Sequence, residues 1–150
     1  MIWHDRFLGL AKHVADSWSK DPSTKVGAVI VDPETNIVVG MGYNGFPRGV
    51  DDNEERYNDR EVKRKLVCHA ELNAILNANK SVRGCDIYVY PTIMKPASCS
   101  ECSKAISQAG IKRLFYRKTD NVSERWIEDS KFSKVILDEA GVECIEIEGN

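Results

Sequence analysis

The sequence has neither a long hydrophobic run nor a strong excess of charge. No apolar stretch approaches the roughly 20 residues of a membrane-spanning helix, so we expect a cytoplasmic protein with no membrane partner. The 21 lysines and arginines nearly balance the 23 aspartates and glutamates, which gives a formal net charge of −2. A near-neutral surface gains little from neutralising phosphates, so nucleic acid is not the expected main partner.

Cysteine is scarce and its number is odd. The five cysteines cannot all pair within one chain, and disulfides are rare in a reducing compartment. Under those conditions a C-x-x-C pair such as Cys99 and Cys102 indicates a metal site or a redox centre. We expect the other three, Cys68, Cys85 and Cys144, to be small buried residues.

Hydrophobic periodicity in the first third of the chain predicts a helix and a hairpin. Apolar side chains at three- and four-residue steps predict a helix over 3–19, with Trp3 and Trp18 in the core and His4 and His13 on the surface. Two β-rich runs, 26–31 and 37–43, flank a turn and predict an antiparallel hairpin, whose first strand is covered on both faces. The charged run 51–56, within 45–65, is expected to be a solvated loop.

The rest of the chain alternates helices and strands. The pattern predicts a helix over 69–78 with Leu72, Ile75 and Leu76 facing inward, a strand over 85–90, a helix over 99–109, a strand over 112–117, a helix over 126–140 and a strand over 142–147. In the last helix the expected core residues are Trp126, Ile127, Phe132, Val135, Ile136 and Leu137. Strands that alternate with helices after a hairpin predict an α/β fold with a mixed five-stranded sheet and helices on its faces. A length of 150 residues suits one hydrophobic core, so we expect a single domain over 1–150.

The strongest chemical pattern joins two distant segments. A histidine at 69, a carboxylate two residues later at Glu71, and the pair Cys99 and Cys102 match the H-x-E and C-x-x-C signature of zinc deaminases. A catalytic zinc takes three protein ligands and keeps one position for water, and His69, Cys99 and Cys102 supply three. The upstream histidine and glutamate favour this metal site over a redox centre.

Glu71 is the expected acid/base group and not a ligand. It has to move protons between water and a base, which requires hydrogen-bond reach to both. Residues two apart point in different directions inside a helix, so His69 must lie at or just before the first turn if both groups share one site. The competing interpretations are a structural zinc site, which four ligands generally close, and unrelated core cysteines.

Four segments carry a resemblance to a known family. They are SKDPSTKVGAV at 19–29, GYNGFPRG at 42–49, HAELNAI at 69–75 and SQAGIKR at 107–113. Together they resemble the cytidine/deoxycytidylate deaminase family, and within it the deoxycytidylate deaminases. The resemblance implies a three-layer α/β/α sandwich and a zinc-dependent hydrolysis of dCMP to dUMP and ammonia. One departure is the absence of the usual proline directly before the first zinc cysteine, since Pro96, Ala97 and Ser98 precede Cys99.

The same resemblance implies substrate-binding residues and partners. Asn44 would contact the deoxyribose, Ser23 and Lys25 would help hold the 5′-phosphate, and Ala70 would lie against the substrate. A hexamer activated by dCTP and inhibited by dTTP is the implied assembly. The alternatives are a nucleic-acid or tRNA base deaminase, a nucleoside or dCTP deaminase, and a catalytically silent effector-binding module. A basic groove with aromatic residues would favour the first alternative, and the sequence shows no basic stripe.

Overall fold

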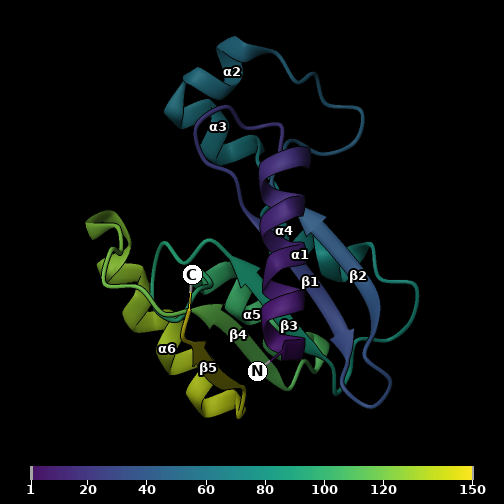
Figure 1. The fold of residues 1–150 in the computed structure, drawn as a ribbon. Helices are drawn as coiled ribbons and strands as arrows, with labels where there is room; N and C mark the ends of the chain where they lie inside the picture. The colour runs from purple at the N-terminus through teal and green to yellow at the C-terminus, as the bar shows by residue number, and fades with distance from the viewer. Residues whose placement is uncertain (1, 150) are drawn as a thin grey trace.

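The computed structural model describes residues 2–149 and contains one five-stranded sheet with helices around it (Figure 1). The helices are α1 (Ile2–Trp18), α2 (Glu54–Asn58), α3 (Arg60–Leu66), α4 (Ala70–Leu76), α5 (Ser100–Ala109) and α6 (Ile127–Ala140), with a 3₁₀ turn, η1, at Glu124–Trp126. The strands are β1 (Gly27–Asp32), β2 (Ile37–Tyr43), β3 (Asp86–Tyr90), β4 (Arg113–Arg117) and β5 (Glu143–Ile147). The predicted order of strands and main helices is confirmed.

The sheet is mixed, as predicted. Its strand order is β2-β1-β3-β4-β5, in which β1 pairs antiparallel with both β2 and β3. The strands β3, β4 and β5 run parallel. Parallel neighbours need a long crossover, and α5 and α6 provide the two crossovers. The hairpin and the crossovers therefore account for the mixed pattern.

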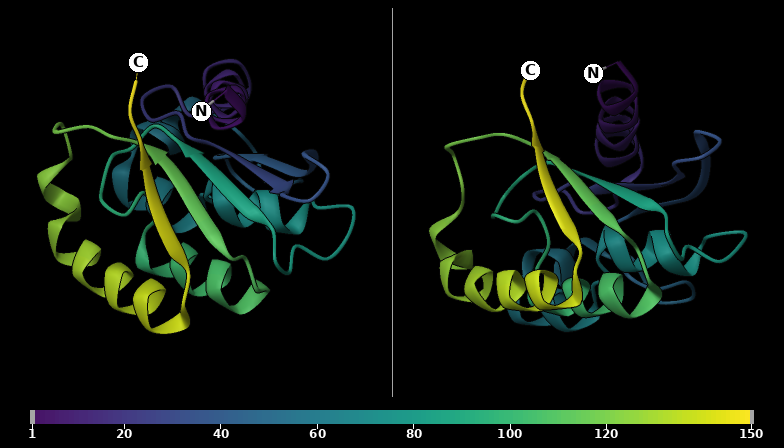
Figure 2. Two further views of the ribbon diagram at one scale, coloured as in Figure 1. Left: turned by 60° about the horizontal axis from the view of Figure 1, so that its bottom comes forward. Right: turned by 90° about the horizontal axis from the view of Figure 1, so that it is seen from below.

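Helices cover both faces of the sheet, and Figure 2 shows α1 on one side and α4, α5 and α6 on the other. Alternate residues of β1 point to the two faces of the sheet. Val29 and Val31 pack under α1, whereas Ala28 and Ile30 belong to the hydrophobic cluster on the opposite face. All four are fully buried or nearly so, which confirms that this strand is covered on both faces. The three-layer α/β/α arrangement is the one expected.

Glycines allow α4 to lie directly on β2. A methyl group added at Gly42 would sit 2.3 Å from the backbone nitrogen of Ala74 and 2.4 Å from the carbonyl oxygen of Ala70. Gly40 is similarly close, with an added methyl group 2.6 Å from the Ala74 carbonyl oxygen. The backbone of β2 therefore fixes the height at which α4 begins, where His69 and Glu71 are found.

The expected loop over 45–65 was wrong in part, because it contains two short helices. Asn53 caps α2 by accepting a hydrogen bond from the backbone nitrogen of Arg56. Asp59 caps α3 by accepting from the backbone nitrogens of Glu61 and Val62. Asn53, one of the polar residues that suggested a solvated loop, is thus a helix cap, as Asn and Asp commonly are. Figure 1 shows α2 and α3 beyond one end of the sheet.

Several residues predicted to be in the core are exposed. Trp3 and Trp18 are 46% and 49% exposed, and they lie near the two ends of α1. In α6 only Ser133 and Leu137 are buried, since a narrow stripe of this helix meets its neighbours. The other residues placed wrongly in the core are Ile127, Phe132, Val135 and, on α4, Leu76, whose inward neighbours are instead Ala70, Glu71 and Ala74.

His4 also differs from its predicted surface position, whereas His13 is exposed as expected. The His4 ring is half-buried, lies 2.7 Å from the Tyr88 hydroxyl and stacks on Phe115. Cys85 is buried, as predicted, but Cys68 and Cys144 are only partly buried.

Within residues 2–149, none of the helices is both long and apolar enough to cross a bilayer. The single domain over 1–150 stays a prediction, and residues 1 and 150 lie outside the described residues.

Candidate metal centre and active site

The three predicted metal ligands lie at the starts of two helices. His69 is the N-cap residue of α4, with extended φ and ψ of −74° and 154°. Cys99 is the N-cap residue of α5, and its sulfur accepts a hydrogen bond from the Cys102 backbone nitrogen one turn later. Because His69 precedes the first turn, its side chain and that of Glu71 reach one site, which meets the geometric condition set by their spacing.

The ligand atoms of His69, Cys99 and Cys102 converge closely enough to hold one metal ion. His69 Nδ1 lies 3.3 Å from Cys99 Sγ and 3.5 Å from Cys102 Sγ, and all ligand atoms of the group lie within 4.8 Å of one another. Zinc–nitrogen and zinc–sulfur bonds at tetrahedral angles separate such atoms by about 3.6 Å. This donor set of one imidazole and two thiols therefore fits zinc in type, number and spacing. Within residues 2–149 these three form the one such group.

The pKa values of the three ligand side chains depend on one another, because the side chains share hydrogen bonds. A hydrogen bond with Cys99 raises the pKa of His69 to about 9, although burial opposes the shift. Hydrogen bonds with Cys102 and His69 lower the pKa of Cys99 to about 4, whereas the Cys99 sulfur and burial raise the pKa of Cys102. Histidine and cysteine bind a metal ion in their deprotonated forms, so a metal ion displaces protons from these ligands as it binds.

Glu71 lies in the same cavity but outside the ligand group. It is 5% exposed, and burial together with the nearby Cys99 thiolate raises the pKa of its carboxyl group to about 7. A carboxyl group with a pKa near neutrality can accept and return a proton at neutral pH. Glu71 therefore has the placement and the electrostatics of an acid/base group.

A buried polar network supports the start of α5 where the usual proline is missing. The Ser98 carbonyl accepts a hydrogen bond of 2.6 Å from the hydroxyl of Ser133, which also lies 2.6 Å from the Ser103 hydroxyl. Asp129 binds the backbone nitrogen and hydroxyl of Ser100. Sequence patterns did not reveal Asp129 or Ser133 as supports for the site, because nothing in their spacing on α6 marks them.

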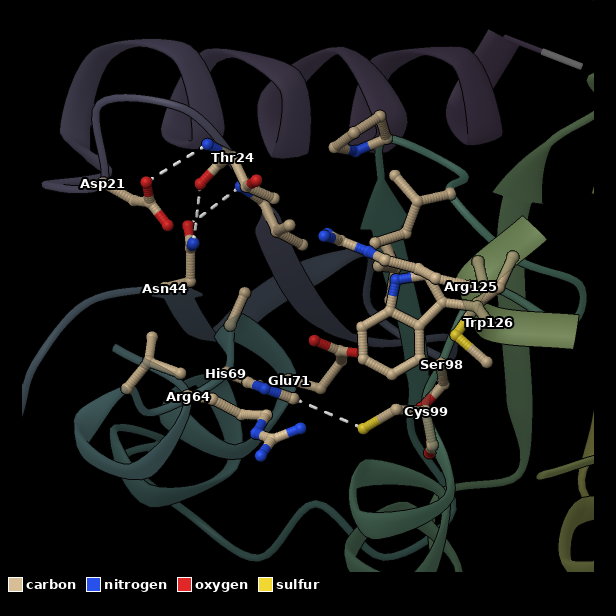
Figure 3. Close-up of a pocket in the computed structure, with 18 of the residues that line it drawn as sticks. Asp21, Thr24, Asn44, Arg64, His69, Glu71, Ser98, Cys99, Arg125 and Trp126 are labelled. Atoms are coloured by element: carbon tan, nitrogen blue, oxygen red, sulfur yellow. Dashed lines mark hydrogen bonds between the residues drawn. The ribbon is translucent and has the colours of Figure 1, made fainter. Parts of the chain in front are cut away.

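His69, Cys99 and Glu71 line a cavity of about 380 Å³, which is large enough for a nucleotide-sized ligand (Figure 3). One side comes from α3 and the start of α4, another from the segment before α5, and a third from η1. Trp126, expected in the core, instead lines this cavity, and its buried Nε1 has no hydrogen-bond partner among residues 2–149. An unpaired buried donor in a cavity wall suits a ligand that carries an acceptor.

Two of the four predicted substrate-binding residues line the cavity, and two do not. Ala70 and Asn44 are among the lining residues, and the Asn44 amide also braces the loop before β1. Its Oδ1 accepts from the Ser19 hydroxyl and the Val26 backbone nitrogen, and its Nδ2 donates to the Thr24 carbonyl. One N–H of this amide therefore has no partner in the described part of the chain.

Ser23 and Lys25 do not line the cavity, contrary to their expected place at the phosphate. The Lys25 ammonium group donates to the backbone carbonyls of Ser19 and Asp21, at 3.1 and 2.9 Å. The Ser23 hydroxyl donates to Asp21 and accepts from Lys63. The Lys25 side chain is used within its own loop, and the Ser23 hydroxyl joins that loop to Lys63 of α3, so the structure gives no support for a phosphate contact by either.

A family model described as the cytidine and deoxycytidylate deaminase zinc-binding region matches residues 1–118. The chain belongs to the cytidine and deoxycytidylate deaminase family. A deaminase of Aliivibrio fischeri from the luxG 3′ region is 41% identical over 144 residues, covering 94% of this chain and 90% of that protein. The deoxycytidylate deaminase of Pongo abelii is 38% identical over 148 residues, covering 93% of this chain and 76% of that protein.

The fold matches that of a solved dCMP deaminase. The dCMP deaminase of cyanophage S-TIM5, crystallised with dCMP and dUMP, superposes with a TM-score of 0.68 at 24% identity, covering 95% of both chains. This similarity confirms the predicted architecture. The zinc-binding family and the three converging ligands together identify zinc as the metal of this site.

Proposed function

We propose that this protein deaminates dCMP to dUMP by zinc-dependent hydrolysis, with release of ammonia. The observation that carries the proposal is the buried carboxyl group of Glu71, which shares a cavity with the ligand cluster and has a pKa near neutrality. The 38% identity to a deoxycytidylate deaminase over most of the chain supports dCMP as the substrate.

In this proposal His69, Cys99 and Cys102 hold the zinc ion. When bound, zinc supplies a Lewis acid that makes water nucleophilic near neutral pH. Glu71 accepts a proton from the attacking water and delivers it to N3 of the cytosine. Glu71 next takes the proton of the new C4 hydroxyl group and passes it to the departing amino group, as the carbon–nitrogen bond breaks and the C4 carbonyl forms. Water and dCMP thereby give dUMP and ammonia, and Glu71 returns to its starting state.

The remaining residues position the substrate. Asn44 is proposed to offer its unused amide N–H to the deoxyribose, and Ala70 forms part of the wall against which the base lies. A cytoplasmic location, a hexameric assembly and regulation by dCTP and dTTP stay predictions.

Ammonia release from dCMP, CMP, dCTP, deoxycytidine and single-stranded DNA tests the proposal. We expect the highest kcat/KM for dCMP. Turnover of single-stranded DNA without turnover of dCMP would favour the base-editing alternative, and a preference for deoxycytidine or dCTP would favour the other deaminase classes. No ammonia from any substrate, with zinc bound, would support the silent module.

A further inference from the structure

Three arginines line the cavity and have little to pair with. Arg60 and Arg64 come from α3, and Arg125 comes from η1. Among residues 2–149 neither Arg60 nor Arg125 forms an ion pair, and Arg64 has one exposed contact, 3.8 Å from Glu61. We call Arg60, Arg64 and Arg125 the mouth arginines.

The acidic residues of the cavity do not neutralise these cations. Asp21 and Glu71 are the two acidic residues among those that line it. The Asp21 carboxylate lies 2.7 Å from the Lys63 ammonium group, so its negative charge is already paired with a cation. Glu71 is buried beside the metal-ligand group. The cavity lining therefore carries four cationic side chains, the mouth arginines and Lys63, against two acidic ones, in a chain whose net charge is −2.

The arginines enclose the reactive groups from two sides. In Figure 3 the side chains of Arg64 and Arg125 extend into the cavity from opposite sides, with His69 and Glu71 between them in this view. Trp126 follows Arg125 in the chain and places its indole, with the unpaired Nε1, along the same wall. A ligand that fits this cavity would place a ring near Glu71 and Trp126 and an anionic group near the arginines.

We propose that the mouth arginines bind the 5′-phosphate of the cytosine nucleotide and make the enzyme selective for a nucleotide over a nucleoside. The proposal rests on the proposed function and replaces the expected phosphate contacts of Ser23 and Lys25, whose side chains do not line the cavity. Guanidinium groups suit this task because their forked donors match phosphate oxygens and remain charged at every relevant pH.

The kinetic experiment compares one pair of substrates that differ only in the phosphate. The double variant Arg64→Gln/Arg125→Gln is expected to lower kcat/KM for dCMP by about 100-fold, roughly tenfold for each lost charged contact. Its kcat/KM for deoxycytidine should change less than about threefold, since the lost contacts reach only the phosphate. The matched control is Arg83→Gln, an exposed arginine outside the cavity, which should leave both values unchanged. Equal losses on both substrates would overturn the proposal.

A binding experiment separates this proposal from the proposed function. Calorimetry with dUMP and deoxyuridine measures the phosphate preference without any turnover. We expect wild type to prefer dUMP, and the double variant, with wild-type zinc content and melting temperature, to lose that preference. The single variant Arg125→Lys should keep part of it, because one cation remains. If the preference survives in the double variant, the arginines are not the phosphate site, whether or not dCMP is deaminated.

Discussion

Asp129 of α6 accepts two hydrogen bonds from Ser100, the residue that directly follows the metal ligand Cys99. Its carboxylate lies 2.8 Å from the Ser100 backbone nitrogen and 2.6 Å from the Ser100 hydroxyl. A helix at the edge of the fold thereby holds the N-terminal turn of α5, on which Cys99 and Cys102 are carried. Asp129 is consequently a positioning residue for the metal.

The first prediction concerns this contact. Asp129→Ala should weaken zinc binding by about 10- to 100-fold, the usual effect of removing a group that orients metal ligands. Competition with a chromophoric chelator measures the change. Glu128→Ala is the control, because Glu128 is exposed and makes one weak contact with Lys131. Unchanged zinc affinity in a folded Asp129→Ala protein would show that Asp129 does not position the ligands.

The second prediction separates metal binding from proton transfer. Glu71→Gln should retain zinc and lose about 10²–10⁴-fold in kcat, since the amide cannot carry the proton. Zinc content by atomic absorption and ammonia release measure the two properties together. Glu101→Gln, an exposed carboxylate on α5, should change neither. An active Glu71→Gln enzyme would contradict the acid/base role, and a zinc-free one would indicate that Glu71 is needed to form the metal site.

The third prediction concerns the contact between β2 and α4. Gly42→Ala should lower the free energy of unfolding by several kcal/mol, about as much as severe core overpacking, because the new methyl group meets rigid backbone atoms of α4. Gly9→Ala is the contrasting variant: it lies within α1 with nothing within 4 Å of the added carbon, and should stabilise the protein by about 0.5–1 kcal/mol. Urea denaturation measures both. Equal stability of the two variants would mean that α4 moves freely away from the sheet.

The fourth prediction is a pH dependence of stability at Asp21. Burial alone would raise the pKa of this carboxyl group, but hydrogen bonds from Lys63 and from the backbone nitrogens of Ser23 and Thr24 outweigh it and lower the pKa. A lowered folded-state pKa stabilises the protein above the unfolded value of about 3.9, and this contribution is lost as the pH falls through the folded-state pKa.

Asp21→Asn should therefore destabilise the protein by about 1–3 kcal/mol at pH 7, and the difference from wild type should shrink toward pH 3. Denaturation curves at a series of pH values provide the measurement. Asp16→Asn, which removes an exposed carboxylate on α1, should give a small difference at every pH. A constant deficit for Asp21→Asn across this range would contradict the assignment.

The metal ligands could be predicted from the sequence because their chemistry is local. His69 and Cys99 each lie directly before a helix, so the spacing within each motif already places Glu71 near His69 and Cys102 near Cys99. The nearly continuous apolar run of β1 likewise predicted a strand that is buried on both faces. These features depend on a few neighbouring residues.

The substrate side of the site could not be predicted in the same way. The arginines of α3 follow a charged run that resembles a solvated loop, and their direction depends on distant contacts. Tyr57 stacks on Phe46 with ring centroids 3.9 Å apart, and Lys63 reaches Asp21. Similarly, Phe132 fits a buried helical stripe, yet α6 meets the rest of the protein along a narrower face than its sequence indicates.

Each reactive side chain stands at the first turn of its helix, so the opposite ends of α4 and α5 carry no part of the chemistry. The chain from Asn79 to Gly84 leaves α4 on the far side and is mostly exposed. Extra residues can be accommodated in this connection without displacing His69 or Cys99, because both are anchored at the other ends of their helices. The protein can therefore accept a fused peptide or a reporter tag between Lys80 and Ser81 while the catalytic constellation keeps its shape.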